Sequence, residues 1–130
     1  MYLLTFNEHI NESKKKFPNI KKFDIDGFTV LMGKDSDSND YLSIKMSNPD
    51  DIWFHAKGVP GSHVLIRVDE NLPTETVIKQ VATIAAKNSK AKDKIIVVYC
   101  KAKFIKKRHD MRPGQVEVDY KNSQEIEISI

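Results

Sequence analysis

The stretch DDIWFHAKGVPGSHVLIR, residues 50–67, constrains the fold more than any other part of the chain. It contains two runs, 52–56 and 63–68, rich in the β-branched and aromatic residues that favour strands. Between them lie Gly58 and the dipeptide Pro60-Gly61, which are typical of turns. The sequence therefore predicts two strands that pair as a hairpin at this point.

Side chains alternate between the two faces of a strand, and this alternation groups the polar and aromatic residues of the stretch. Trp53 and His55 share one face of the first strand, and His63 and Arg67 share one face of the second. If the strands pair with these faces on the same side, all four side chains lie on one surface. We expect this surface to be the functional part of the chain.

The segments before this hairpin predict a second hairpin and a short helix. Residues 21–25 and 28–32 flank Asp26-Gly27, a dipeptide suited to a two-residue type I′ turn. Residues 33–40 are a polar loop, in which Ser38 or Asn39 is a suitable N-cap for a short helix over residues 40–46.

The segments after the hairpin predict one amphipathic helix and three strands. Thr74 is a suitable N-cap for a helix that runs to about Lys90. Residues 95–100 have the composition of a buried central strand, and residues 116–120 and 126–130 alternate like a terminal hairpin. The expected fold is α+β: a single domain over residues 1–130, with a largely antiparallel or mixed sheet covered by one long helix and a short helix.

Cysteine usage and hydropathy favour a cytoplasmic protein that makes no contact with membranes. The single Cys100 cannot form an intrachain disulfide, and the N-terminus lacks the pattern of a secretory signal. No apolar run approaches the roughly 20 residues of a membrane span.

Positive charge is concentrated in two segments although the formal net charge is only +3. Residues 14–22 contain five lysines and no acid, and residues 101–112 contain six basic residues and one acid. Such segments are typical of a surface that binds a polyanion, although each one alone is also compatible with a solvated face.

Metal-binding and catalytic interpretations of the histidines have less support from the sequence. His55 and His63, with Cys100 and His109, show no short-range ligand spacing, so no metal or other cofactor is expected. No nucleophile with an orienting carboxylate accompanies the two histidines. A nucleic-acid surface and a packed core around a lone tryptophan remain as alternatives.

The hairpin stretch closely resembles the signature of the NFACT-R domain, the RNA-binding module of the NFACT family of ribosome-associated quality-control factors. DGFTVLMGKDSDSNDYLS, VIKQVATIAAKNSKAKD and IIVVYCKAKFIKKRHDMRPGQVEV are similar to further family segments in the same order, so the resemblance covers about residues 21–130. Larger family members also have an N-terminal domain and a coiled coil, for which this chain is too short.

The resemblance implies a non-enzymatic module that contacts tRNA or large-subunit ribosomal RNA in translation or ribosome quality control; protein partners stay unknown. The alternatives are an RNA-modification or hydrolase accessory that uses the two histidines, a DNA-binding protein and a protein-interaction adaptor. The residues expected at the nucleic-acid interface combine family positions with nearby cations: Lys34, Asn39, Asp40, Trp53, His55, Ser62, His63, Arg67, Lys101, Lys103, Lys106, Lys107 and Arg108.

Overall fold

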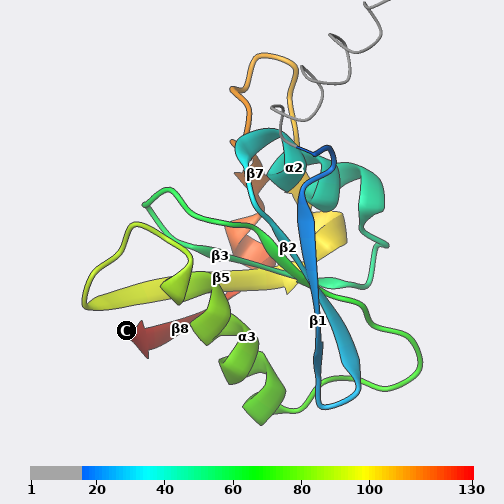
Figure 1. Cartoon of the computed structure of the whole chain (residues 1–130), viewed down its shortest axis with the longest axis vertical. Coiled ribbons are helices and arrows are strands. Elements are labelled where there is room, and N and C mark those ends of the chain that lie inside the picture. Colours follow the sequence, from blue (N-terminus) through cyan, green and yellow to red (C-terminus); the bar gives the residue numbers. More distant parts are fainter. Residues whose placement is uncertain (1–15) are drawn as a thin grey trace, which may run out of the picture.

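The computed structural model describes residues 16–130, so Lys14 and Lys15 of the first basic segment lie outside the described residues. Six strands form one sheet in the order β1-β2-β4-β3-β5-β8, and β6 and β7 form a separate pair. All of these pairings are antiparallel. With helix α3 packed on the sheet (Figure 1), the expected α+β class is confirmed.

Strands β1 (Ile20–Ile25) and β2 (Phe28–Gly33) form the first predicted hairpin. Its two turn residues, Asp26 and Gly27, have φ angles of 52° and 88°. Positive φ at both positions is what a type I′ turn requires, and the right-handed twist of such a turn matches that of the strands. The local turn signal was therefore sufficient to predict this hairpin.

Helix α2 (Ser36–Asp40) begins earlier than predicted and continues directly into a π-helical segment, η1 (Tyr41–Met46). The N-cap is Asp35, whose Oδ1 accepts a hydrogen bond from the Ser38 N–H at 2.8 Å. The prediction of Ser38 or Asn39 as the cap was therefore wrong. These residues are polar but buried, because tertiary contacts, rather than solvent, satisfy their side chains.

Strands β3 (Ile52–Ala56) and β4 (Val64–Ile66) pair as the second predicted hairpin, with Trp53 opposite Leu65. β4 is shorter than the predicted run 63–68. Its ladder ends because the Val68 N–H donates to the buried Asp51 carboxylate at 2.9 Å.

Helix α3 (Glu75–Lys87) covers one face of the sheet. The Thr74 hydroxyl accepts from the Val77 N–H at 3.3 Å, which confirms the predicted cap. The helix ends three residues short of the predicted end because Asn88 leaves the helical conformation. Its buried side chains are Val77, Val81, Ala82, Ala85 and Ala86.

Strand β5 (Lys94–Lys101) confirms the predicted interior strand, but the predicted terminal hairpin is wrong. β8 (Gln124–Ser129) pairs with β5 rather than with the preceding strand. β7 (Glu117–Val118) pairs instead with β6 (Ile105–Lys106), which follows the short helix η2 (Ala102–Phe104). The free edge of β5 offers β8 a longer row of backbone partners than a local hairpin would.

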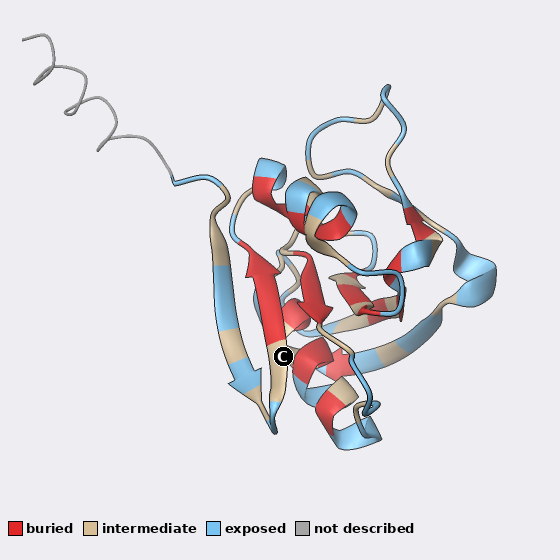
Figure 2. Cartoon of the chain, turned by 90° about the vertical axis from the view of Figure 1, so that its right-hand side faces the viewer, coloured by how far each residue is buried: buried red, intermediate tan, exposed pale blue. Residues whose placement is uncertain are grey.

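The second face of the sheet is also covered. Leu42 of η1 and Ile105 of β6 pack there with Leu31, Trp53 and Leu65 from the strands. Figure 2 shows that the buried residues lie on the central strands and on the parts of the helices that face them. Within residues 16–130 no helix has both the length and the apolar character needed to cross a membrane.

Candidate functional site

Trp53, His55 and His63 form one aromatic cluster on the face of the sheet opposite α3. The ring centroids of the two histidines are 4.9 Å apart, and the indole lies 5.2 Å from His63 and 5.9 Å from His55. The predicted convergence of these three side chains is confirmed. Trp53 is only 1% exposed, so its indole contributes packing and has no free face for a ligand.

A buried hydroxyl, Ser43 of η1, connects two rings of the cluster. The indole Nε1–H of Trp53 donates to Ser43 Oγ at 2.8 Å, and Ser43 Oγ lies 2.7 Å from Nδ1 of His63. The hydroxyl accepts from the indole, and in the tautomer of His63 that carries its proton on Nε2, Nδ1 accepts the hydroxyl hydrogen. The sequence prediction missed Ser43; its spacing of four residues from Asn39 becomes informative only when residues 36–46 are recognised as helical.

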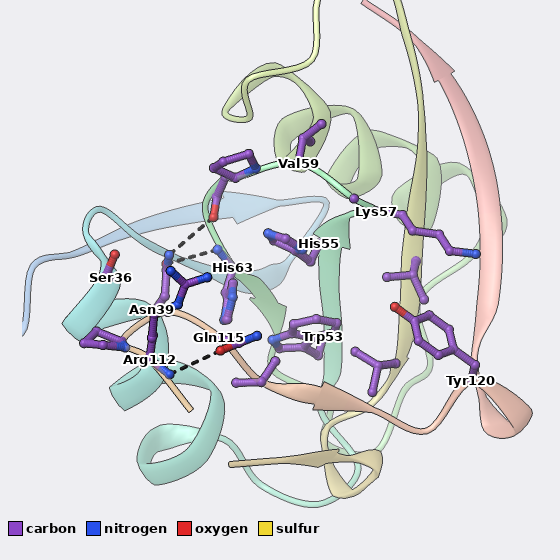
Figure 3. A pocket seen from close by; sticks show the side chains of 18 residues that line it. Ser36, Asn39, Trp53, His55, Lys57, Val59, His63, Arg112, Gln115 and Tyr120 are labelled. Carbon is purple, nitrogen blue, oxygen red and sulfur yellow. Dashed lines mark hydrogen bonds between the residues drawn. The ribbon is translucent and has the colours of Figure 1, made fainter. Parts of the chain in front are cut away.

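Asn39 holds the start of β4 in place. Its Oδ1 accepts from the His63 backbone N–H at 3.0 Å, and its Nδ2 donates to the Gly61 carbonyl at 3.3 Å (Figure 3). A Cβ at Gly33 would lie 2.1 Å from the same Oδ1, so only glycine allows this approach. Asn39 therefore acts on the cluster through the backbone. Ser62, also predicted at the interface, donates its backbone N–H to the Asn88 carbonyl at 3.0 Å.

Burial keeps both imidazoles neutral. It lowers the pKa of His63 to about 3, with the nearby His55 acting in the same direction and the backbone of Asn39 and Gly114 opposing it. Burial also lowers the pKa of His55, against a weaker opposing effect of the Gly61 backbone. At neutral pH each ring therefore offers one hydrogen-bond donor and one acceptor, and neither carries a charge.

A cleft of about 850 Å³ opens beside the cluster (Figure 3). The two histidines and Trp53 line it from the sheet, and the β3–β4 turn lines it through Val59 and Pro60. The opposite wall is the segment 112–116, which ends the second basic segment and leads into β7.

Lys107 and Asp40 fix the base of the loop that forms this wall. The Lys107 ammonium donates to the carbonyls of Arg112 and Gln115 and lies 3.2 Å from Asp40 Oδ2. The same carboxylate oxygen accepts from the Gly114 N–H at 3.0 Å. Both residues were predicted to contact nucleic acid, and the structure shows that their side chains shape the cleft wall.

Arg67 does not join the histidines. It follows β4 at the end where Ile66 pairs with Ile52, roughly 10 Å along β3 from His55. Its guanidinium lies 2.8 Å from the fully buried Asp51 and also donates to the Met46 carbonyl at 2.6 Å. The expectation that Arg67 shares a surface with the cluster is therefore wrong, because its guanidinium pairs with Asp51, which directly precedes β3 at the end far from His55.

The predicted cations fall into two groups. Lys101 pairs with Asp50 at 3.5 Å, and Arg108 pairs with Asp110 and Glu117. Three others have exposed side chains without a carboxylate partner in the described part of the chain; these are Lys34, Lys103 and Lys106. Arg112 belongs to the second basic segment but was not among the predicted interface residues. Its side chain is also exposed, and it lines the cleft.

Metal ligation finds no support in the described residues. Within residues 16–130 no group of three or more His, Cys, Asp or Glu side chains is placed to hold an ion. Cys100 is buried, and burial raises its pKa to about 11, which disfavours the thiolate form.

The fold and site define a small α+β domain built around a buried Trp–Ser–His cluster, and comparison identifies its family. Residues 16–120 match the family described as NFACT protein RNA binding domain, and the chain belongs to this family.

Relatives carry the same domain in longer chains. The Rqc2 homolog RqcH of Bacillus subtilis is 46% identical over 95 residues, which cover 72% of this chain and 16% of the relative. Coiled-coil domain-containing protein 25 of Mus musculus is 34% identical over 96 residues, or 68% of this chain and 46% of the relative. This chain thus spans less than half the length of either relative.

A solved structure shares the fold as well as the sequence. The C-terminal part of the fibronectin/fibrinogen-binding protein from Streptococcus suis superposes with a TM-score of 0.76 at 32% identity. The match covers 88% of this chain and 46% of that chain.

Proposed function

We propose that this chain is a non-enzymatic RNA-binding module that contacts tRNA or large-subunit ribosomal RNA in ribosome-associated quality control. The family description names RNA binding, and relatives that contain the same segment are named Rqc2 homologs. The observation that carries the proposal is the position of Arg112: it brings the second basic segment to the rim of the cleft that the His55–His63 pair lines.

Phosphate contacts are assigned to the exposed cations without carboxylate partners among residues 16–130, namely Lys34, Lys103, Lys106 and Arg112. Lys34 directly follows β2, and its N–H donates to the Asn19 carbonyl, next to the start of α2. A cation already paired with a carboxylate must exchange one anion for another. The unpaired cations therefore contribute most to RNA affinity.

A hydrolytic role for the histidines is less well supported. Ser43 Oγ and His63 Nδ1 are 2.7 Å apart, a distance seen in nucleophile–base pairs. However, Ser43 is only 2% exposed and its hydroxyl accepts from Trp53, so it cannot reach a substrate. The groups that act on the His63 pKa include no carboxylate that would orient the ring as a base.

Salt dependence tests the electrostatic part of the proposal. Affinity for single-stranded RNA is expected to fall between about 50 and 200 mM salt, with a slope of about 0.7 in log K per log salt for each phosphate engaged. Lys34→Ala and Lys106→Ala should each reduce this slope by about 0.7. Lys79→Ala, which removes an exposed lysine from α3, is the matched control and should leave the slope unchanged.

The identity of the nucleic acid is tested with three further probes: purified tRNA, purified large ribosomal subunits, and single-stranded DNA of the same sequence as the RNA. Binding to tRNA or to the subunit supports the proposed partner. The proposal is contradicted if the single-stranded DNA binds as tightly as the RNA of the same sequence while neither tRNA nor the large subunit binds. An affinity for RNA that does not change with salt rules out the phosphate contacts.

A further inference from the structure

His55 is the ring of the aromatic cluster that meets the cleft. Trp53 and His63 are each only 1% exposed, whereas His55 is half-buried. The plane of the His55 ring is tilted by 31° from the indole plane and by 75° from the His63 plane. His55 therefore contacts a tilted indole and meets His63 in an edge-to-face arrangement, and as the most exposed of the three rings it is the one that a ligand in the cleft meets first.

The two rings that contact His55 are themselves fixed by hydrogen bonds. Ser43 fixes both the indole and His63, and Asn39 fixes the backbone from which His63 extends. A pre-organised aromatic surface loses little entropy when a second ring stacks on it. This arrangement favours a flat ligand.

The lining of the cleft suits a neutral, planar group better than a phosphate. Burial lowers the pKa of His55, so the ring is uncharged at neutral pH. Val59, Pro60 and Val116 supply apolar walls, and the exposed side chain of Gln115 supplies an amide. Imidazole and amide groups offer both donors and acceptors, as the edge of a nucleobase requires.

The cations at the cleft lie on its rim. Lys57 is already paired with Glu125 at 2.5 Å, so Arg112 is the rim cation that is available to an anion. The volume of about 850 Å³ falls within the range of sites that enclose small molecules, roughly 300–1,000 Å³. A base inside the cleft with its phosphate at the rim matches this distribution of charge.

We propose that the cleft binds one unpaired nucleobase of the RNA, which stacks on His55 and is hydrogen-bonded by Gln115, with the attached phosphate at Arg112. This inference rests on the proposed RNA-binding function and adds what the site recognises: a single base that has left its stack, not a run of phosphates. His63, Ser43 and Asn39 act as positioning residues beneath it.

Nuclear magnetic resonance titration with AMP, GMP, CMP and UMP tests the pocket without any RNA. At millimolar concentration at least one nucleotide should shift the ring resonances of His55 and the side-chain amide of Gln115. Ribose 5-phosphate, which lacks the base, should leave them in place. Equal shifts with ribose 5-phosphate, or no shift with any nucleotide, would overturn the proposal.

Matched variants connect the pocket to RNA binding. His55→Ala and the surface change Gln115→Ala should each weaken single-stranded RNA binding about tenfold while the salt slope stays the same. His109→Ala, in the same loop but outside the cleft lining, should change neither quantity. A urea titration of each variant separates loss of binding from loss of folding. Gln115→Ala removes an exposed side chain whose Oε1 accepts from the Arg112 N–H at 3.2 Å, so the titration also shows whether this contact matters for stability.

The two proposals fail differently. If RNA binds with the expected salt slope but His55→Ala and Gln115→Ala have no effect, the base pocket is wrong and the RNA-binding function stands. If nucleotides shift His55 but no RNA binds, the pocket stands and the proposed function is wrong.

Discussion

Acidification is expected to destabilise the fold through His63. The folded chain lowers the pKa of this ring to about 3, against about 6.5 for an exposed histidine. Below pH 6.5 the unfolded chain takes up a proton that the folded chain does not. As far as His63 is concerned, the free energy of unfolding therefore keeps its full value above about pH 6.5 and decreases as the pH falls toward 3. At about 1.4 kcal/mol per pH unit, a change from pH 7 to pH 5 removes about 2 kcal/mol.

The groups around His63 do not change the direction of its pKa shift, and so acidification still lowers the free energy of unfolding. Burial has the largest effect and lowers the His63 pKa, and His55 on β3 and Lys107 act in the same direction. Hydrogen bonds with the backbone of Asn39 and Gly114 raise the pKa, but by less than burial lowers it. His55 has a lowered pKa of its own, so its protonation adds to the loss in the same pH range. A decrease of 2 kcal/mol is a large share of the 5–15 kcal/mol typical of a domain.

Urea denaturation at pH 7, 6 and 5, followed by the fluorescence of Trp53, measures this effect. Stopping at pH 5 keeps exposed carboxylates, with pKa values near 4, mostly ionised. His109→Gln, which removes an exposed imidazole, should keep the full pH dependence. His63→Gln should reduce the pH dependence to the share that His55 contributes, whatever the stability of the variant itself. A wild-type free energy of unfolding that is equal at pH 7 and pH 5, within about 0.5 kcal/mol, would refute the reasoning.

Three further predictions follow from buried groups. Ser43→Ala leaves the indole N–H of Trp53 and a His63 nitrogen unpaired, so it should lower the free energy of unfolding by about 3 kcal/mol, and an unchanged urea midpoint would contradict this. Arg67→Ala should cost about 3 kcal/mol because it strips the buried Asp51 of its cation, and it should leave the salt slope of RNA binding unaltered. A reduced slope would instead make Arg67 a phosphate contact. Cys100 should react with a disulfide reagent on the order of 100-fold more slowly in the folded chain than in urea; equal rates would disprove its burial.

The elements that could be predicted from the sequence are those with local signals. Asp26-Gly27 specifies a turn type on its own, and Thr74 followed by apolar residues at helical spacing specifies where α3 begins. Alternation along β3 was sufficient to place Trp53 and His55 on the same side. Each of these signals acts within a few residues of its position.

The elements that could not be predicted depend on partners distant in sequence. The polar residues Ser38 and Asn39 are typical of a loop, but they are buried in a helix because the Asn39 side chain pairs with the backbone of Gly61 and His63, just before β4. β8 alternates like half of a hairpin, yet it pairs with β5 because the sheet has a free edge there. Periodicity gives the faces of a strand but not its neighbour.

The candidate site was predicted in part, for the same reason. The two histidines were found because they flank one local turn, and their contact follows from strand pairing. Arg67 was misplaced because its partner, Asp51, lies in the loop before β3, and no spacing rule reveals that the carboxylate is fully buried. Ser43 was missed because its partners, Trp53 and His63, lie 10 and 20 residues away.

The structure also changes which substitutions are informative about binding. Trp53 and His63 belong to the signature that identifies the family, yet both are buried and share one hydroxyl, so a change at either alters folding and binding together. His55, Gln115 and Arg112 reach the cleft or its rim and carry little of the core. Loss of RNA binding in these three variants, at unchanged stability, therefore separates recognition from folding, which no substitution of the buried signature residues can do.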